Sequence, residues 1–149
     1  MPEVKIVKHI NANPEKVWEL ISDIKKGPEW VTVMKDLVHT TDNPLKEGAV
    51  YREFSKVGPK EGETEWRVTT FDPPNIQVHR SRESDMHIDL TMQVMPNDEG
   101  TRFLHQTEFT MMPKFRPLGW LLESLFVKRL MSREMHQTVE NLKKIAEEG

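Results

Sequence analysis

The sequence contains no cysteine, and this absence excludes two classes of structure. Disulfide-stabilised folds and thiolate metal centres both require cysteine. A chain without cysteine is also compatible with a reducing compartment. The first residues, MPEVKIVKHIN, lack the long apolar stretch of a signal peptide, so we expect a cytoplasmic protein.

A large excess of either charge is missing as well. The 21 basic residues nearly balance the 24 acidic residues, so the net charge of -3 gives no reason to expect a nucleic-acid partner. Long apolar runs are also absent, because the most apolar one, residues 118–130, is interrupted by Glu123, Lys128 and Arg129. That run is too short and too charged to span a bilayer, so we expect no stable membrane insertion.

Familiar catalytic and cofactor motifs are missing too. The sequence has no GxGxxG fingerprint, no P-loop, no GxSxG elbow and no HExxH pair. Its histidines follow no spacing that is typical of zinc or iron ligands. We therefore predict neither a metal site nor a cofactor.

What the sequence does contain is enough apolar material for a core. With 149 residues and 36% hydrophobic side chains, we predict a single domain over residues 1–149. Residues 3–11 alternate apolar and charged side chains, which predicts a strand. Asn13 and Pro14 then form a helix start, and Gly27-Pro28 ends the region, which predicts one or two short helices.

The rest of the chain changes its period twice. Alternation between turn signals predicts strands near residues 34–42, 49–57, 62–72, 76–84, 86–95 and 101–112. An apolar stripe at helical spacing then predicts one long helix over about residues 116–147. The expected architecture is α+β, with a curved seven-stranded antiparallel sheet around one long C-terminal helix. Such a sheet cannot touch the helix everywhere, so we also expect an internal cavity.

Five segments carry a resemblance to a known family. In chain order they are NPEKVWELISDIKKGPEW, KEGAVYRE, VTTFDPP, GTRFLHQTEF and MHQTVENLKKIAEE. Together they resemble the START-like, Bet v 1-like superfamily (SRPBCC), and within it the branch of polyketide cyclase/dehydrase and lipid transport proteins. The resemblance implies a helix-grip fold whose cavity takes a lipid, a polyketide or a quinone-like molecule. It implies no catalytic residues, because the family shares a cavity rather than one catalytic motif.

The last predicted hairpin can be aligned from its turn. A turn centred near residues 98–99 puts four pairs on one face: Val94 with Phe103, Met92 with His105, Leu90 with Thr107, and Ile88 with Phe109. That face is apolar apart from His105 and Thr107, so we expect it to line the cavity. A buried His105 should have a pKa below about 6.5, and its neutral ring would bind a ligand or pass it a proton. The alternative is a core histidine that hydrogen-bonds a neighbouring hydroxyl or water.

The preceding hairpin fits two registers. In one, Trp66 faces Phe54 and Arg52 points inward, where it would pair with a ligand carboxylate. A shift by one residue points Tyr51 and Glu53 inward instead, where Glu53 would meet a ligand hydroxyl. The turn sequence VGPKEGE allows either register, and the charged residue can also lie at a strand edge with its head group in solvent.

Large apolar side chains gather in two further places. Trp18 and Trp30 lie in and just after the first helix, and the last helix begins with a wide apolar segment that includes Leu125. Contact between the two tryptophans and this segment is the simplest interpretation, and the rings would then cap one end of the cavity. A cavity mouth, a homodimer contact or a membrane surface would also account for the width of the apolar segment.

Three functions are compatible with these patterns. The first is binding or transport of a small, largely hydrophobic ligand, which the apolar inner face favours. The second is an aromatase/cyclase or dehydratase that acts on a polyketide-like substrate with His105 as acid or base, although such chemistry usually needs two or three placed polar groups. The third is a protein-docking module. The sequence therefore leaves open whether the protein is an enzyme.

Overall fold

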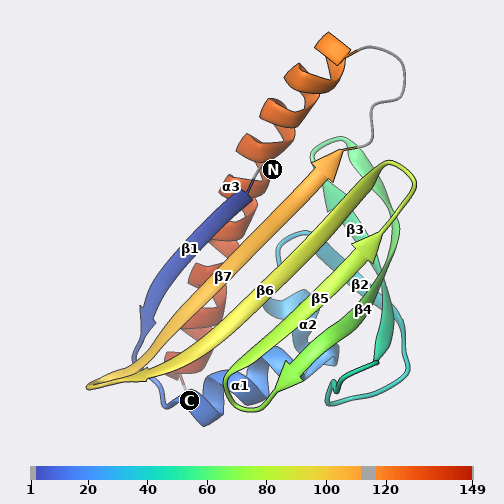
Figure 1. Ribbon diagram of the computed structural model, residues 1–149. Coiled ribbons are helices and arrows are strands. Elements are labelled where there is room, and N and C mark those ends of the chain that lie inside the picture. Colours follow the sequence, from blue (N-terminus) through green and yellow to red (C-terminus); the bar gives the residue numbers. More distant parts are fainter. Residues whose placement is uncertain (1–2, 112–116, 149) are drawn as a thin grey trace.

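The fold is a single antiparallel sheet with one long helix packed across it (Figure 1). The computed structural model describes residues 3–111 and 117–148, with side chains from residue 125 onward in the last helix. Its seven strands follow the order β1-β7-β6-β5-β4-β3-β2, and every neighbouring pair is antiparallel. This confirms the predicted α+β architecture.

The elements follow the order expected from the sequence. They are β1 (Glu3–Ile10), α1 (Pro14–Ser22), the 3₁₀ helix η1 (Ile24–Lys26), α2 (Gly27–Trp30), β2 (Met34–Thr40), β3 (Val50–Val57), β4 (Lys60–Asp72), β5 (Ile76–Arg82), β6 (Met86–Asn97), β7 (Gly100–Met111) and α3 (Pro117–Glu148). Helix α1 begins as predicted, because the Asn13 side chain accepts a hydrogen bond from the Lys16 backbone N–H and Pro14 occupies the first turn.

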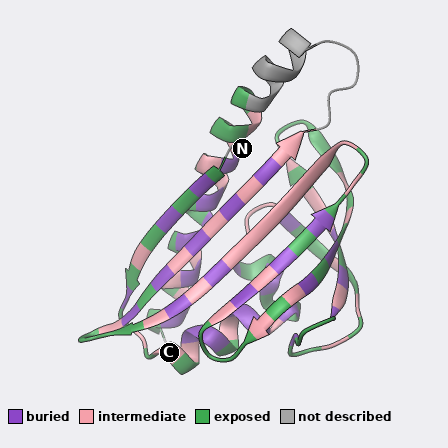
Figure 2. Cartoon of the chain, viewed as in Figure 1, coloured by how far each residue is buried: buried purple, intermediate pink, exposed green. Residues whose placement is uncertain are grey.

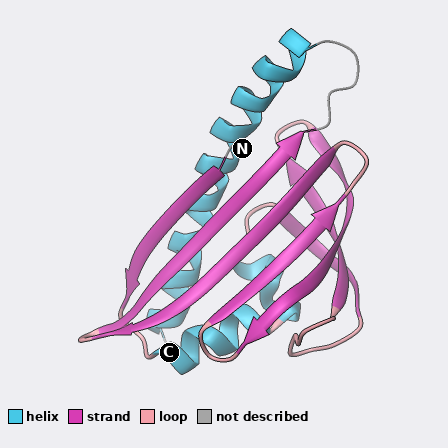
Figure 3. Ribbon diagram, viewed as in Figure 1, coloured by secondary structure: helices cyan, strands magenta, loops and turns pink. Residues whose placement is uncertain are grey.

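Helix α3 leaves part of the sheet uncovered. Its buried stripe repeats at helical spacing through Met131, Met135, Val139, Leu142 and Ala146. The helix packs mainly against β1 and also touches β7, while β2, β3 and β4 curve away at the opposite edge (Figure 3). The space between the helix and these far strands is where a cavity can form. Among the helices that the structure describes, none has an apolar stretch long enough to cross a membrane.

The β6–β7 hairpin has the predicted register. Val94 pairs with Phe103, Met92 with His105, Leu90 with Thr107, and Ile88 with Phe109. Buried residues alternate with less buried ones along β7, as the bands in Figure 2 show. The inner face of this hairpin therefore turns toward α3, as the alternation indicated.

The β3–β4 hairpin turns inward the face given by the second prediction, but its pairing is shifted by three residues from the Trp66–Phe54 register rather than by one. Tyr51 pairs with Trp66 across a two-residue turn, Gly58-Pro59, so Tyr51 and Glu53 are the inward-facing residues. Gly58 has a φ of 61°, which glycine adopts without strain, and an added Cβ would lie 2.6 Å from Leu130 Cδ2 of α3. The tight turn thus packs against the last helix. The sequence alone did not decide the register of this hairpin, and in the structure the observed register occurs together with this contact.

Arg52 consequently lies on the outer face, and the expectation that it points into the cavity is wrong. Its guanidinium is exposed and lies 3.3 Å from the Glu65 carboxylate and 3.9 Å from that of Glu63. Because side chains alternate across a strand, the shift that turned Glu53 inward turned Arg52 outward.

The two tryptophans are buried, as predicted, but they are not covered by Leu125 or Phe126. Trp18 packs at a tilt against Phe71, with ring centroids 5.1 Å apart, and Trp30 is 5% exposed. The Asn141 side chain donates to the Trp30 carbonyl, so α2 is tied to the second half of α3. Leu125 and Phe126 in the first half are 59% and 57% exposed, which contradicts the predicted cap around them. Trp120, Leu121 and Leu122, which shared that prediction, lie outside the described side chains.

Candidate functional site: a cavity between the sheet and the last helix

A cavity of about 640 Å³ lies between the sheet and α3. Its walls come from the inner faces of β3 to β7, from α2 and the residues after it, and from one face of α3. The apolar lining includes Ile88, Leu90, Met92, Val127, Leu130, Met131 and Met135. This volume lies in the range of small-molecule sites, and apolar walls with few polar groups are typical of them.

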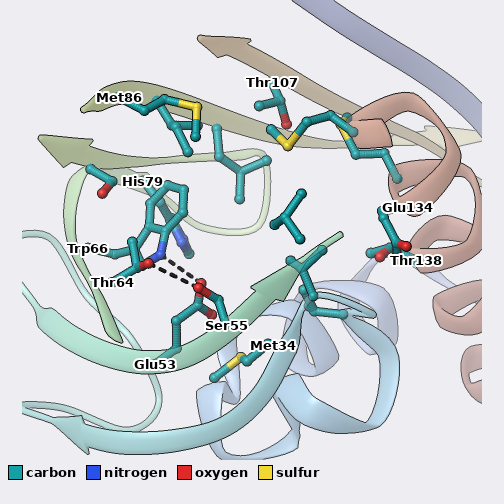
Figure 4. A pocket seen from close by; sticks show the side chains of 18 of the residues that line it. Met34, Glu53, Ser55, Thr64, Trp66, His79, Met86, Thr107, Glu134 and Thr138 are labelled. Atoms are coloured by element: carbon teal, nitrogen blue, oxygen red, sulfur yellow. Dashed lines mark hydrogen bonds between the residues drawn. The ribbon is translucent and has the colours of Figure 1, made fainter. Parts of the chain in front are cut away.

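Glu53 is the buried acid of the cavity. It is 6% exposed, and its Oε1 accepts a hydrogen bond of 3.0 Å from the indole N–H of Trp66 (Figure 4). Burial raises the pKa of Glu53 to about 7, and the Trp66 hydrogen bond opposes this rise only in part. A carboxyl with this pKa is present in both protonation states near neutrality, so it can accept or donate a proton there.

A chain of hydrogen bonds runs along the same wall. The Tyr51 hydroxyl bonds His79 Nδ1 at 2.7 Å, His79 Nε2 bonds Gln77 Oε1 at 2.8 Å, and the Gln77 amide donates to Ser22 Oγ at 3.1 Å. Gln77 Oε1 only accepts, so Nε2 carries the proton and the tyrosine hydroxyl donates to Nδ1. Burial lowers the pKa of His79 to about 3, with a smaller contribution from His105, and burial raises the pKa of Tyr51 well above its usual range. Both rings are therefore neutral.

His105 faces the cavity from β7. The residue is 5% exposed, its ring lies 6.1 Å from that of Phe103, and its Nδ1 is buried without a hydrogen-bond partner among the described residues. Burial lowers the pKa of His105 to about 4, in the direction predicted from the sequence. A neutral imidazole without a protein partner can donate or accept one hydrogen bond from a ligand.

The comparison with known proteins places this architecture in a family. The family model described as polyketide cyclase / dehydrase and lipid transport matches residues 1–147. The chain belongs to this family. The resemblance predicted from the five segments is thereby confirmed. Members of the family, as its description says, include both cyclases and lipid transport proteins, so membership alone does not select one activity.

Individual relatives agree in fold but are distant in sequence. The uncharacterized protein Rv1546 of Mycobacterium tuberculosis is 22% identical over 120 residues, which cover 80% of this chain and 84% of the relative. TTHA0849 from Thermus thermophilus is 22% identical with a TM-score of 0.78 and covers 96% of this chain and 95% of its own. The Zhui aromatase/cyclase from Streptomyces sp. R1128 is 16% identical with a TM-score of 0.80 and covers 97% and 93% of the two chains. At these identities the similarity shows a common fold.

The predicted site residues of this family member divide into three groups. His105, Thr107, Met92, Leu90, Trp66 and Trp30 line the cavity. Phe103, Phe109 and Trp18 are buried in the core cluster between the sheet and the helices, outside the described lining. Arg52 and Leu125 are exposed, as described above. The sequence therefore predicted part of the cavity lining, and the polar composition of the cavity was only partly anticipated.

His79 is a buried polar residue of the cavity wall that the sequence interpretation missed. Gln77, His79 and Ser81 all point inward from β5 and are at most 2% exposed. The signal was present in the alternation of QVHRSR, but a row of polar residues at period two usually indicates a solvent face. The sequence did not reveal this row as buried because its hydrogen-bond partners, Tyr51 for His79 and Ser22 for Gln77, are far away in the sequence. Within residues 3–111 and 117–148, no group of three or more acids or histidines is placed to hold a metal ion.

Proposed function

We propose that the protein binds a small, largely hydrophobic molecule in this cavity, as a carrier or a binding module. The observation that carries the proposal is the cavity itself, about 640 Å³ of space in a domain of 149 residues. Natural cores are close-packed and contain few voids larger than a water molecule. An apolar occupant of this space would remove the apolar lining from contact with water, which is favourable.

The composition of the walls supports an apolar occupant with a small number of polar atoms. Burying apolar ligand surface is favourable by about 25 cal/mol per Å². The hydrogen-bonding capacity of Tyr51 and His79 is largely used within the protein, whereas His105 Nδ1 has no partner in the described part of the chain. A ligand carbonyl or hydroxyl can therefore form a hydrogen bond with His105.

Native mass spectrometry of freshly purified protein, followed by titration with the neutral dye Nile red, tests this proposal. We expect a co-purifying mass or saturable Nile red fluorescence. Leu90→Trp fills the cavity from β6, and Thr91→Trp places the same ring on the opposite face of that strand. The first variant should lose binding and the second should keep it. Equal binding by the two variants, or none by the wild-type protein, contradicts the proposal.

A second candidate function is acid–base catalysis of the aromatase/cyclase type. The specific observation in its favour is that Glu53, with a pKa of about 7, and the neutral His105 line one cavity. Two such groups can remove and return a proton during ring closure of a polyketide-like substrate. The test is turnover of a linear poly-β-ketone by wild-type protein and by Glu53→Gln and His105→Phe. Turnover that persists in both variants, or that is absent in the wild-type protein, argues against catalysis, whereas binding alone supports the first function.

A further inference from the structure

Among the described residues that line the cavity and its mouth, acidic side chains outnumber lysine and arginine. Seven of its described lining residues are aspartate or glutamate, and one, Lys60, is a lysine. The Lys60 ammonium forms an ion pair with Asp85, which also lines the cavity. A ligand carboxylate or phosphate would therefore find no unpaired lysine or arginine within the described lining.

Glu53 lacks a cationic partner in the interior. Trp66 donates to its Oε1, and no ion pair or second hydrogen bond to the Glu53 carboxyl is present in the described part of the chain. The rings of Tyr51 and Trp66 are stacked beside this carboxyl, with centroids 6.4 Å apart and planes 14° apart. The hydroxyls of Ser55 and Thr64 lie on the same wall, 3.0 Å from each other (Figure 4).

These groups match one chemical class of ligand. An ammonium group needs an anion, hydroxyl or carboxylate acceptors and, where available, the face of an aromatic ring. Building on the proposed ligand-binding function, we propose that the ligand is an amine: a protonated amino group on an apolar skeleton, which pairs with Glu53 beside Trp66 and Tyr51. The skeleton then lies along the methionines and leucines of β6 and α3.

The energetics favour this class over an anion. A buried carboxylate without a cation is unfavourable, and a ligand ammonium removes this cost by forming a charge-assisted hydrogen bond. A ligand carboxylate in the same position would add a second negative charge in a low-dielectric space. A neutral alcohol would fill the apolar part equally well but would leave Glu53 without a counter-ion.

The test compares three ligands that share one skeleton: octylamine, octanol and octanoate. Calorimetric titrations are made at about pH 8, above the pKa of about 7 to which burial raises Glu53, so that the carboxyl is ionised. We expect octylamine to bind about tenfold or more tightly than octanol, as for a hydrogen bond between charged groups, and octanoate to bind most weakly. This comparison of three ligands uses the wild-type protein only. Octanol or octanoate binding as tightly as octylamine overturns the inference.

Two matched variants locate the effect. Glu53→Gln keeps the size of the side chain and an oxygen acceptor for Trp66, and it should reduce octylamine binding to the level of octanol. Glu99→Gln removes an equal charge from the exposed β6–β7 turn and should leave the preference for the amine intact. Octylamine affinity that is unchanged in Glu53→Gln overturns the inference. If octanol binds and the amine preference is absent, the ligand-binding function stands without this refinement, whereas failure of all three ligands to bind contradicts both.

Discussion

Two buried histidines face the same cavity from different parts of the sheet, and they differ in one respect. His79 on β5 has both ring nitrogens hydrogen-bonded, to Tyr51 and to Gln77. His105 on β7 has a buried Nδ1 without a partner in the described part of the chain. Because buried polar groups in native proteins are usually paired, the first histidine is a structural element and the second is available to a ligand.

The two histidines differ in hydrogen bonding because of residues on the same strand and residues distant in sequence. Their cross-strand neighbours do not explain the difference. His79 is flanked across the sheet by Val68 and Leu90, and His105 by Ile6 and Met92, so both have apolar neighbours on either side. His79 obtains its partners from Gln77, two residues earlier, and from Tyr51 on β3. The corresponding residue before His105 is Phe103, whose ring offers no strong hydrogen-bonding group. The wall on β5 is thus a connected network of hydrogen bonds, and the wall on β7 is apolar apart from His105 and Thr107.

The largest expected effect tests the network directly. His79→Phe leaves the Tyr51 hydroxyl and the Gln77 carbonyl oxygen buried without their partners, so we expect a loss of about 3 kcal/mol in the free energy of unfolding. The matched change His105→Phe removes a ring with no described hydrogen bond at Nδ1 and should change stability by less than about 1 kcal/mol at neutral pH. Urea denaturation of the two variants measures the contrast. Equal losses would show that the two histidines play the same structural role.

Glu53 gives an effect of similar size, and this effect depends on pH. Burial raises the pKa of this carboxyl from 4.5 in the unfolded chain to about 7 in the folded protein. The folded state therefore binds a proton that the unfolded state releases between these values, so stability falls as pH rises through this window. The Glu53→Gln variant has no carboxyl at this position, so its stability does not fall in this pH window for that reason. We expect the variant to be more stable than the wild-type protein by about 3 kcal/mol at pH 8, and equally stable near pH 4.5.

Thermal or urea unfolding at the two pH values provides the measurement for Glu53. Glu99→Gln is the matched control, because Glu99 is exposed in the β6–β7 turn and should give no pH-dependent difference. A Glu53→Gln variant that follows the wild-type stability at both pH values would indicate that the carboxyl reaches solvent.

A smaller effect is expected on ligand binding through His105. The residue lines the cavity, and its neutral ring offers one donor and one acceptor. His105→Phe should weaken binding of Nile red, whose carbonyl can accept from the ring, by about 1–2 kcal/mol, the scale of one hydrogen bond. Fluorescence titration measures the change, with folding checked by circular dichroism. Unchanged affinity in a folded variant would mean that His105 is a core residue, which was the alternative that the sequence allowed.

The sequence predicted the fold and one wall of the cavity because the information there is local. The short turn after Pro96 and the apolar alternation of two long strands allow only one register that buries the apolar face, and the structure has that register. The long helix was predicted for the same reason, since its stripe repeats at helical spacing over many turns.

The other wall could not be predicted because it depends on contacts between distant residues. The β3–β4 register accompanies a turn at Gly58-Pro59 that packs against Leu130, which lies far along the chain in the last helix. The position of Trp30 depends likewise on Asn141, and that of the following loop on the Thr138 hydroxyl, which accepts from the Thr32 N–H. Periodicity gives the face of an element, but it does not say which part of a helix a distant loop contacts.

The smallest expected effect is at Arg52, and it tests the register of that second wall. Its guanidinium pairs with Glu65 on the outer face, where the side chains of the two residues are 49% and 57% exposed. Exposed pairs of this kind contribute little, because solvent screens the attraction and ordering two long side chains costs entropy. Arg52→Ala should therefore change the free energy of unfolding by about 0.5 kcal/mol or less and leave Nile red affinity unchanged. If Arg52 pointed inward, the same change would alter the cavity wall and shift that affinity, so a clear loss or gain of binding would contradict the pairing of Tyr51 with Trp66.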